Sequence, residues 1–167
     1  ECRTIMIQFQ REVLKRADDL IPMFLEDTKN SGYTYSLGND RFIFEFVVLE
    51  YGFAFWQWQY TNCEQIPDTT ASNEDLFEHL KMGSSFSYFS DKEINSNFPF
   101  VYQAYTQMGY YGYDISNFKD LLTEVEEPTS RIFLPKDLNP EYDCCAMQKI
   151  NTWIQKQGNN MIFIYGE

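Results

Sequence analysis

The sequence contains a single histidine among 167 residues and none of the short motifs that mark common active sites. A G-x-S-x-G nucleophile elbow, a phosphate-binding loop, a dinucleotide-binding glycine pattern and an H-E-x-x-H zinc motif are all absent. One histidine is also too few for the usual zinc arrangements, and the four cysteines form no C-x-x-C pair. The sequence therefore predicts no metal site and no cofactor.

Basic residues are scarce as well. There are 13 lysine and arginine residues against 25 aspartate and glutamate residues, so the formal net charge is −12. Nucleic acids and anionic membranes are both bound through a basic surface. This charge balance disfavours both kinds of partner. It is compatible with the attraction of a cationic group, such as a free amino terminus, but does not require one.

The four cysteines are Cys2, Cys63, Cys144 and Cys145. The adjacent Cys144 and Cys145 cannot easily bond to each other, although either could reach a distant partner. We expect these cysteines to be free, buried thiols. Their number alone does not fix the cellular compartment.

Aromatic residues are abundant, at 18% of the chain, and they concentrate in residues 42–60, FIFEFVVLEYGFAFWQWQY. Fourteen of these nineteen residues are apolar or aromatic, and none is proline. A helix that is apolar all round belongs in the middle of a domain. Glu45 and Glu50 inside the stretch argue against a membrane span. We expect this helix to be the central and most buried element.

Glu50 is the unusual residue of that helix, because its helical neighbours include Phe46, Val47, Phe53 and Ala54. A carboxylate in such surroundings must be paired, protonated or facing a cavity. One interpretation is a structural acid held by an internal partner such as an arginine or a tyrosine. The other is a charge that faces a substrate pocket. The sequence leaves both open.

The flanking segments predict further helices. Residues 3–29 have helical spacing with a kink or break at Pro22. Ser72 and Asp75 form a capping box for a helix over 73–82, which places His79 on the surface beside acidic neighbours. The remaining predicted helices cover 97–108, 116–122 and 140–157.

Two stretches remain ambiguous or unusual. The tyrosines of GYYGYD, residues 109–114, either fill the edge of the core or line a cleft. Residues 161–165, MIFIY, are typical of a strand covered on both faces, as in a parallel sheet. No other segment resembles its partner, so we expect the chain to be a piece of a larger α/β protein.

Five segments, in this order, resemble bacterial secreted tripeptidyl aminopeptidases: FQREVLKR, VLEYGFAFWQW, GYYGYD, FLPKDL and MIFIYGE. Such proteins are α/β-hydrolase serine peptidases, similar in plan to the lysosomal Pro-Xaa carboxypeptidases. The resemblance implies that residues 1–158 form a helical cap domain inserted into the hydrolase core. It also implies that 159–167 begin the returning core strand. The Ser-His-Asp triad would then lie outside this chain, which should be inactive alone and contain no catalytic residue.

The resemblance implies a secreted, periplasmic or cell-surface exopeptidase that removes short peptides from amino termini. Its partners would be the peptide substrate and the hydrolase core of the same protein. From the chemistry of the residues we predict Glu50 as the acceptor for the substrate amine. The predicted substrate-binding residues beside it are Tyr51, Phe55, Trp56, Trp58, Tyr110, Tyr111 and Tyr113. The alternative is a stand-alone helical module that binds peptides in an aromatic groove.

Overall fold

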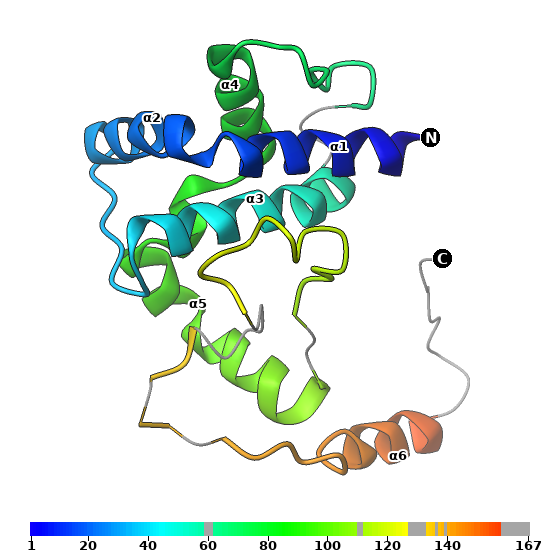
Figure 1. Ribbon diagram of the computed structural model, residues 1–167. Helices are drawn as coiled ribbons and strands as arrows, with labels where there is room; N and C mark the ends of the chain where they lie inside the picture. Colours follow the sequence, from blue (N-terminus) through cyan, green and yellow to red (C-terminus); the bar gives the residue numbers. More distant parts are fainter. Residues whose placement is uncertain (59–61, 110–111, 127–132, 136, 139, 158–167) are drawn as a thin grey trace.

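The computed structural model describes residues 1–58, 62–109, 112–126, 133–135, 137–138 and 140–157. Within these ranges every regular element is helical, in agreement with the predicted mainly α fold (Figure 1). The elements are α1 (Cys2–Lys15), α2 (Ala17–Asn30), α3 (Asp40–Trp58), α4 (Asn73–Gly83), the 3₁₀ helix η1 (Phe86–Phe89), α5 (Asp91–Gln103), the π-helix η2 (Ala104–Met108) and α6 (Gln148–Gln157). The predicted strand at 161–165 and the predicted boundary at 158 and 159 lie outside the described residues.

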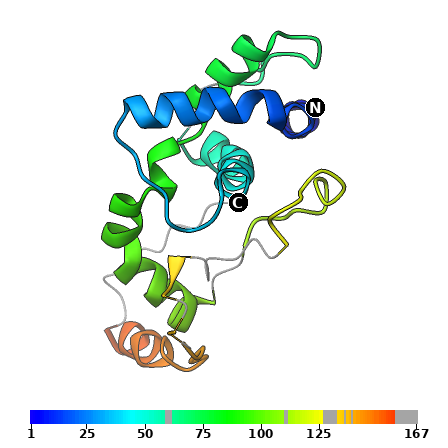
Figure 2. The ribbon, with the colours of Figure 1, turned by 60° about the vertical axis from the view of Figure 1, so that its left-hand side comes forward.

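Helix α3 is the centre of the fold, as its composition predicts. Eleven of its nineteen residues are buried, and its length matches the apolar stretch of the sequence. Helices α1 and α2 follow one another along one side of α3, and α4 packs against α1, α2 and α3 (Figure 1). Figure 2, viewed almost along α3, shows the 112–126 segment on a different side of that helix from α1 and α2. No helix among the described residues is long and apolar enough to cross a membrane.

The first predicted helix is two helices, and the break falls at Arg16 rather than at Pro22. The Arg16 guanidinium donates hydrogen bonds to the carbonyl oxygens of Ala71 and Thr69, both at 2.7 Å. This side chain therefore ties the junction to the loop before α4. Because α2 begins anew at Ala17, Pro22 lies in its second turn, where the missing N–H removes a single helical hydrogen bond.

Side-chain caps set the starts of three helices. Ser72 caps α4 as predicted, since its hydroxyl accepts a hydrogen bond from the Asp75 N–H at 3.1 Å. For α3 the cap is Asn39, whose Oδ1 accepts from the Phe42 N–H at 2.8 Å. Ser90 caps α5, which therefore begins at Asp91, six residues before the predicted start at 97.

Two other predicted helices differ from the structure. Residues 116–121 form a turn with local backbone hydrogen bonds, and the Asn117 carbonyl accepts a further hydrogen bond from Arg11, so no helix forms at 116–122. The last helix begins at Gln148 instead of 140, because residues 144–147 form a turn anchored by the Asp143 N–H on the carbonyl of Thr106. Apolar spacing alone did not reveal these tertiary contacts.

The cysteines correct another prediction. Cys2, at the start of α1, forms a disulfide with Cys63 in the loop after α3, across 61 residues of sequence. Cys144 and Cys145 are free but exposed, with their Sγ atoms 3.5 Å apart. The expectation of free, buried thiols is therefore wrong for Cys2 and Cys63, while Cys144 and Cys145 are free as expected but not buried. The disulfide joins the first residue of α1 to the segment that follows the carboxyl end of α3.

Candidate functional site

A pocket of about 390 Å³ opens beside the second half of α3. Its lining residues come from helix α3, from the η1–α5 region and, with Tyr113, from the 112–126 segment. Most of its surface is aromatic or aliphatic. The lining residues are Glu50, Phe53, Ala54, Gln57, Trp58, Ser85, Tyr88, Asn97, Phe100 and Tyr113.

Glu50 is the only acid among these lining residues, and it is 6% exposed. Its Oε2 accepts a hydrogen bond from the Tyr113 hydroxyl. Burial raises the pKa of Glu50 to about 7, and the tyrosine hydrogen bond offsets only part of that rise. Both interpretations of the sequence thus apply, because the carboxyl group has an internal tyrosine partner and also faces a cavity.

The structure brings three of the predicted site residues together and separates the others. Glu50, Trp58 and Tyr113 line the same pocket. Trp56 lines a neighbouring cavity of about 600 Å³, which shares Phe53 and Tyr113 with the first pocket. Tyr110 and Tyr111 lie outside the described residues.

Tyr51 and Phe55 are in the core rather than on a pocket wall. Both are buried, and the Tyr51 hydroxyl hydrogen-bonds to Nε2 of His79 at 2.8 Å. A Cβ added at Gly83 would lie 2.3 Å from a carbon of the Tyr51 ring, so the end of α4 needs glycine to approach this closely. Tyr51 therefore acts as a link between α3 and α4.

His79 corrects a further prediction, since its side chain is buried on the face of α4 that packs against α1 and α3 and is not on the surface. Its ring packs edge-on against Phe9, with the ring centres 5.0 Å apart. Burial lowers the pKa of His79 to about 4, so the imidazole is neutral at physiological pH. A neutral ring can share a hydrogen bond with the Tyr51 hydroxyl, which explains why the fold accommodates a histidine here.

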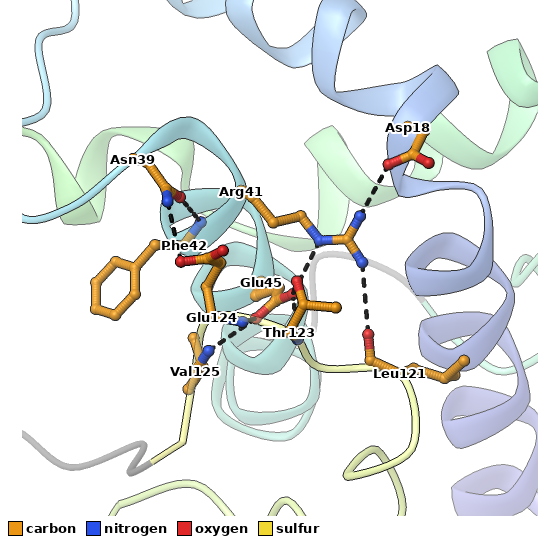
Figure 3. Close-up of polar contacts among 9 residues, drawn as sticks. All are labelled: Asp18, Asn39, Arg41, Phe42, Glu45, Leu121, Thr123, Glu124 and Val125. Atoms are coloured by element: carbon orange, nitrogen blue, oxygen red, sulfur yellow. Dashed lines mark hydrogen bonds and ion pairs between the residues drawn. The ribbon is translucent and has the colours of Figure 1, made fainter.

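Glu45, near the start of α3, binds the carboxyl-terminal part of the 112–126 segment, which also contains Tyr113 (Figure 3). Its fully buried carboxylate accepts hydrogen bonds at 2.8–3.0 Å from the N–H groups of Thr123, Glu124 and Val125, and one at 2.9 Å from Arg41 Nε. Burial alone would raise the pKa of Glu45, but the hydrogen bonds together outweigh burial and lower it. Glu45 is therefore an ionised structural anchor at the start of α3.

The middle of the 112–126 segment is held by Arg11 of α1. Arg11 forms a two-pronged ion pair with Asp120, at 2.8 and 2.6 Å, and also donates to the Asn117 carbonyl. The 112–126 segment is thus fixed at two places on two helices. These contacts position Tyr113 against Glu50, although Tyr113 lies in irregular backbone.

Sequence reasoning missed several walls of the pocket. Phe53 and Ala54 follow Glu50 by three and four residues, the spacing that places side chains on one helix face. That spacing was a usable signal. By contrast, Asn97 and Phe100 reach the pocket from α5. Nothing in the local sequence indicates which face of α3 that helix approaches.

The arrangement is suited to binding an organic cation with an apolar part. A carboxyl group in the pocket can accept hydrogen bonds from an ammonium group, and the surrounding rings can cover hydrocarbon. No lysine or arginine is among the described residues that line the pocket. Within the described part of the chain, no group of three or more His, Cys, Asp or Glu side chains could hold a metal ion.

Comparison with known proteins adds the family context. The model of the PS-10 peptidase S37 family matches residues 1–167. A prolyl tri/tetrapeptidyl aminopeptidase of Streptomyces mobaraensis is 29% identical over 168 residues, which cover 99% of this chain and 35% of that protein. The chain therefore spans about a third of the length of this curated relative. No solved structure matches the chain. The resemblance to a tripeptidyl aminopeptidase type of peptidase is confirmed.

Proposed function

Because the chain belongs to the PS-10 peptidase S37 family, we propose that it is the helical cap of a serine exopeptidase that removes short peptides from amino termini. In this proposal a Ser-His-Asp triad outside the chain cleaves the peptide bond. The cap covers that site and admits only peptide ends. The peptidase acts outside the cell, as the resemblance in the sequence implies.

An exopeptidase of this kind needs a fixed anchor for the charged amino terminus, because the anchor sets the distance to the scissile bond. Glu50 is the proposed anchor. The observation that carries the proposal is a nearly buried carboxyl group in an aromatic pocket, within a chain of a peptidase family. The ammonium group would bind beside the Glu50 carboxyl group, which among the described residues accepts a hydrogen bond from the Tyr113 hydroxyl.

Tyr113 contributes to this anchor in two ways. Its hydroxyl holds one carboxylate oxygen of Glu50 in place, and its ring forms part of the pocket wall. Within the described residues, the other oxygen, Oε1, has no hydrogen-bond partner and is available to a bound amine. A pre-positioned acceptor loses little side-chain entropy on binding, which favours affinity.

The test is Glu50→Gln in the peptidase that contains this chain, with a free and an amino-acetylated form of one peptide substrate. A charge-assisted hydrogen bond is worth roughly 1.5–3 kcal/mol, so kcat/KM for the free peptide should fall about 10- to 150-fold. The acetylated peptide carries no charge to lose, and its slower hydrolysis should change little. Equal losses on both substrates would mean that Glu50 only supports the fold.

A further inference from the structure

Three large apolar side chains stand half exposed around the Glu50 pocket. Phe53 is 49% exposed, Trp58 is 56% exposed and Phe100 is 57% exposed. They come from two different helices and line one cavity. Leaving such side chains partly in water forgoes some of the stabilisation that full burial would give. An apolar group that enters the pocket would recover part of it.

The polar residues that line the pocket indicate what kind of ligand this apolar group belongs to. Among the described residues that line it, Glu50 is the only charged one, while Gln57, Ser85 and Asn97 are neutral. A ligand that complements this lining has one positive charge next to a sizeable hydrocarbon or aromatic group. An amino-terminal residue with a large apolar side chain has both features within a few bonds of each other.

We propose that this pocket selects substrates by their first residue, with Glu50 binding its ammonium group and Phe53, Trp58 and Phe100 enclosing a bulky apolar side chain. The proposal rests on the proposed function, because it assigns the first residue of the peptide to the same pocket. It goes further by naming the chemical class that is preferred: leucine, phenylalanine and similar residues over glycine and alanine.

Ala54 sets the depth available to that side chain. It lies one helical turn after Glu50, on the same face of α3, and it lines the pocket while being almost fully buried. Its single methyl group leaves room that a larger residue at this position would fill. Ala54→Val should therefore shift the preference from large first residues toward small ones.

The experiment uses tripeptide p-nitroanilides that differ only in the first residue, glycine, alanine, leucine or phenylalanine, and the peptidase that contains this chain. Burial of the larger side chain should raise kcat/KM for phenylalanine over alanine by roughly 10- to 100-fold. Phe100→Ala should lower this ratio by roughly 2- to 12-fold, the range for one lost aromatic contact. Tyr102→Ala on the same helix, outside the pocket, should leave the ratio unchanged.

Within one variant, the ratio of kcat/KM for the phenylalanine substrate to that for the alanine substrate separates specificity from folding. A loss of folded enzyme lowers both rates by the same factor and leaves this ratio unchanged. A flat first-residue series would overturn the selection proposal, even if acetylation and Glu50→Gln still show that the amine is bound. A preference for bulky residues that neither Phe100→Ala nor Ala54→Val alters would also overturn it, by placing selection elsewhere. If Phe100→Ala lowers all four rates equally, Phe100 supports the folded enzyme and not the choice of first residue, and the proposal fails. Loss of the Glu50→Gln effect on free amines would count against the proposed function itself.

Discussion

At the scale of single residues, Glu50 and His79 are both buried ionisable groups whose pKa values move in opposite directions. Burial raises the pKa of Glu50 to about 7 and lowers that of His79 to about 4. Both shifts have one cause, since an apolar interior disfavours whichever form carries charge. In the folded protein both shifts therefore favour the neutral form more than the unfolded chain does, and both make the stability of the fold depend on pH.

Glu50 gives the first stability prediction. Its folded pKa of about 7 exceeds the ordinary value of 4.5, so the folded state holds this proton more tightly than the unfolded chain does. The resulting stabilisation is complete below pH 4.5 and is lost as pH rises to about 7, by roughly 2–4 kcal/mol. Glu50→Gln removes this dependence. Urea unfolding of wild type and variant between pH 4.5 and 8 measures it.

His79 does not disturb that comparison, because it is present in both proteins. Its lowered pKa acts with the opposite sign: stability is lost as pH falls from 6.5 toward 4. The difference in unfolding free energy between the variant and wild type therefore reports Glu50 alone. A difference that stays constant across the pH range would contradict the raised pKa.

The residues of the pocket show what helical spacing can predict. Glu50, Phe53 and Ala54 lie on one face, as three- and four-residue spacing requires. Tyr51 and Phe55, one and five residues after Glu50, turn into the core instead. The aromatic character of the stretch suggested a pocket wall, but the face on which each ring lies decides whether it can be one.

At the scale of elements, Glu45 joins the start of α3 to the 112–126 segment. Glu45→Gln removes the charge and replaces one acceptor oxygen by a donor that faces backbone N–H groups. Breaking a buried, hydrogen-bonded ion pair on one side should destabilise the fold by roughly 3–5 kcal/mol. Because Arg41 also contacts Asp18 and the Leu121 carbonyl, the effect should fall at the low end of that range.

Glu124→Gln is the matched control for this change. The Glu124 side chain is exposed, and its Oε2 accepts a single hydrogen bond from Asn39 at 2.9 Å (Figure 3). Its loss should alter stability by no more than about 0.5 kcal/mol. Chemical unfolding at pH 7 distinguishes the two variants, and similar small effects for both would show that Glu45 does not anchor the segment.

The helix boundaries divide into those with local causes and those without. Ser72 and Asp75 predict the start of α4 because the cap and its partner are three residues apart. The start of α5 has the same kind of signal in Ser90 and Glu93. The apolar spacing of 97–108, however, predicts that the helix starts later than it does. The start of α6 depends on a turn held by the distant Thr106 carbonyl, which no local pattern reveals.

At the scale of the whole molecule, the Cys2–Cys63 disulfide closes a long loop that contains α1, α2 and α3. A crosslink over this separation stabilises the fold mainly by restricting the unfolded chain, by roughly 2–4 kcal/mol. Replacing both cysteines by serine should lower the unfolding free energy by that amount. Calorimetry or denaturant titration of the double variant, without reductant, provides the measurement.

The control is the double variant Cys144→Ser and Cys145→Ser, whose thiols are free and exposed. Its unfolding free energy should equal that of wild type when both are measured without a reducing agent, and again when both are measured with one. If both double variants unfold like wild type, the crosslink makes no contribution to the folded state. If both are weakened, the second pair has a structural role that its exposure does not indicate.

The sequence predicted the general architecture better than its connections. A mainly helical fold around α3 followed from fourteen apolar residues in nineteen, because only a central position can bury most of them. Two connections join residues more than sixty positions apart in the sequence: the Cys2–Cys63 disulfide and the hydrogen bond from Tyr113 to Glu50. Such contacts depend on how helices pack in three dimensions, and no spacing rule encodes them.

The close approach of Gly83 to the Tyr51 ring has a consequence for how the family can diverge. Any side chain at position 83 would have to occupy the space of that ring, so the two positions cannot vary independently. Among relatives, a residue larger than glycine at position 83 should occur together with a smaller residue at position 51. The histidine at position 79 should then also be replaced, because the loss of the tyrosine hydroxyl leaves its buried ring nitrogen without a partner. These three positions should therefore be inherited as one correlated unit.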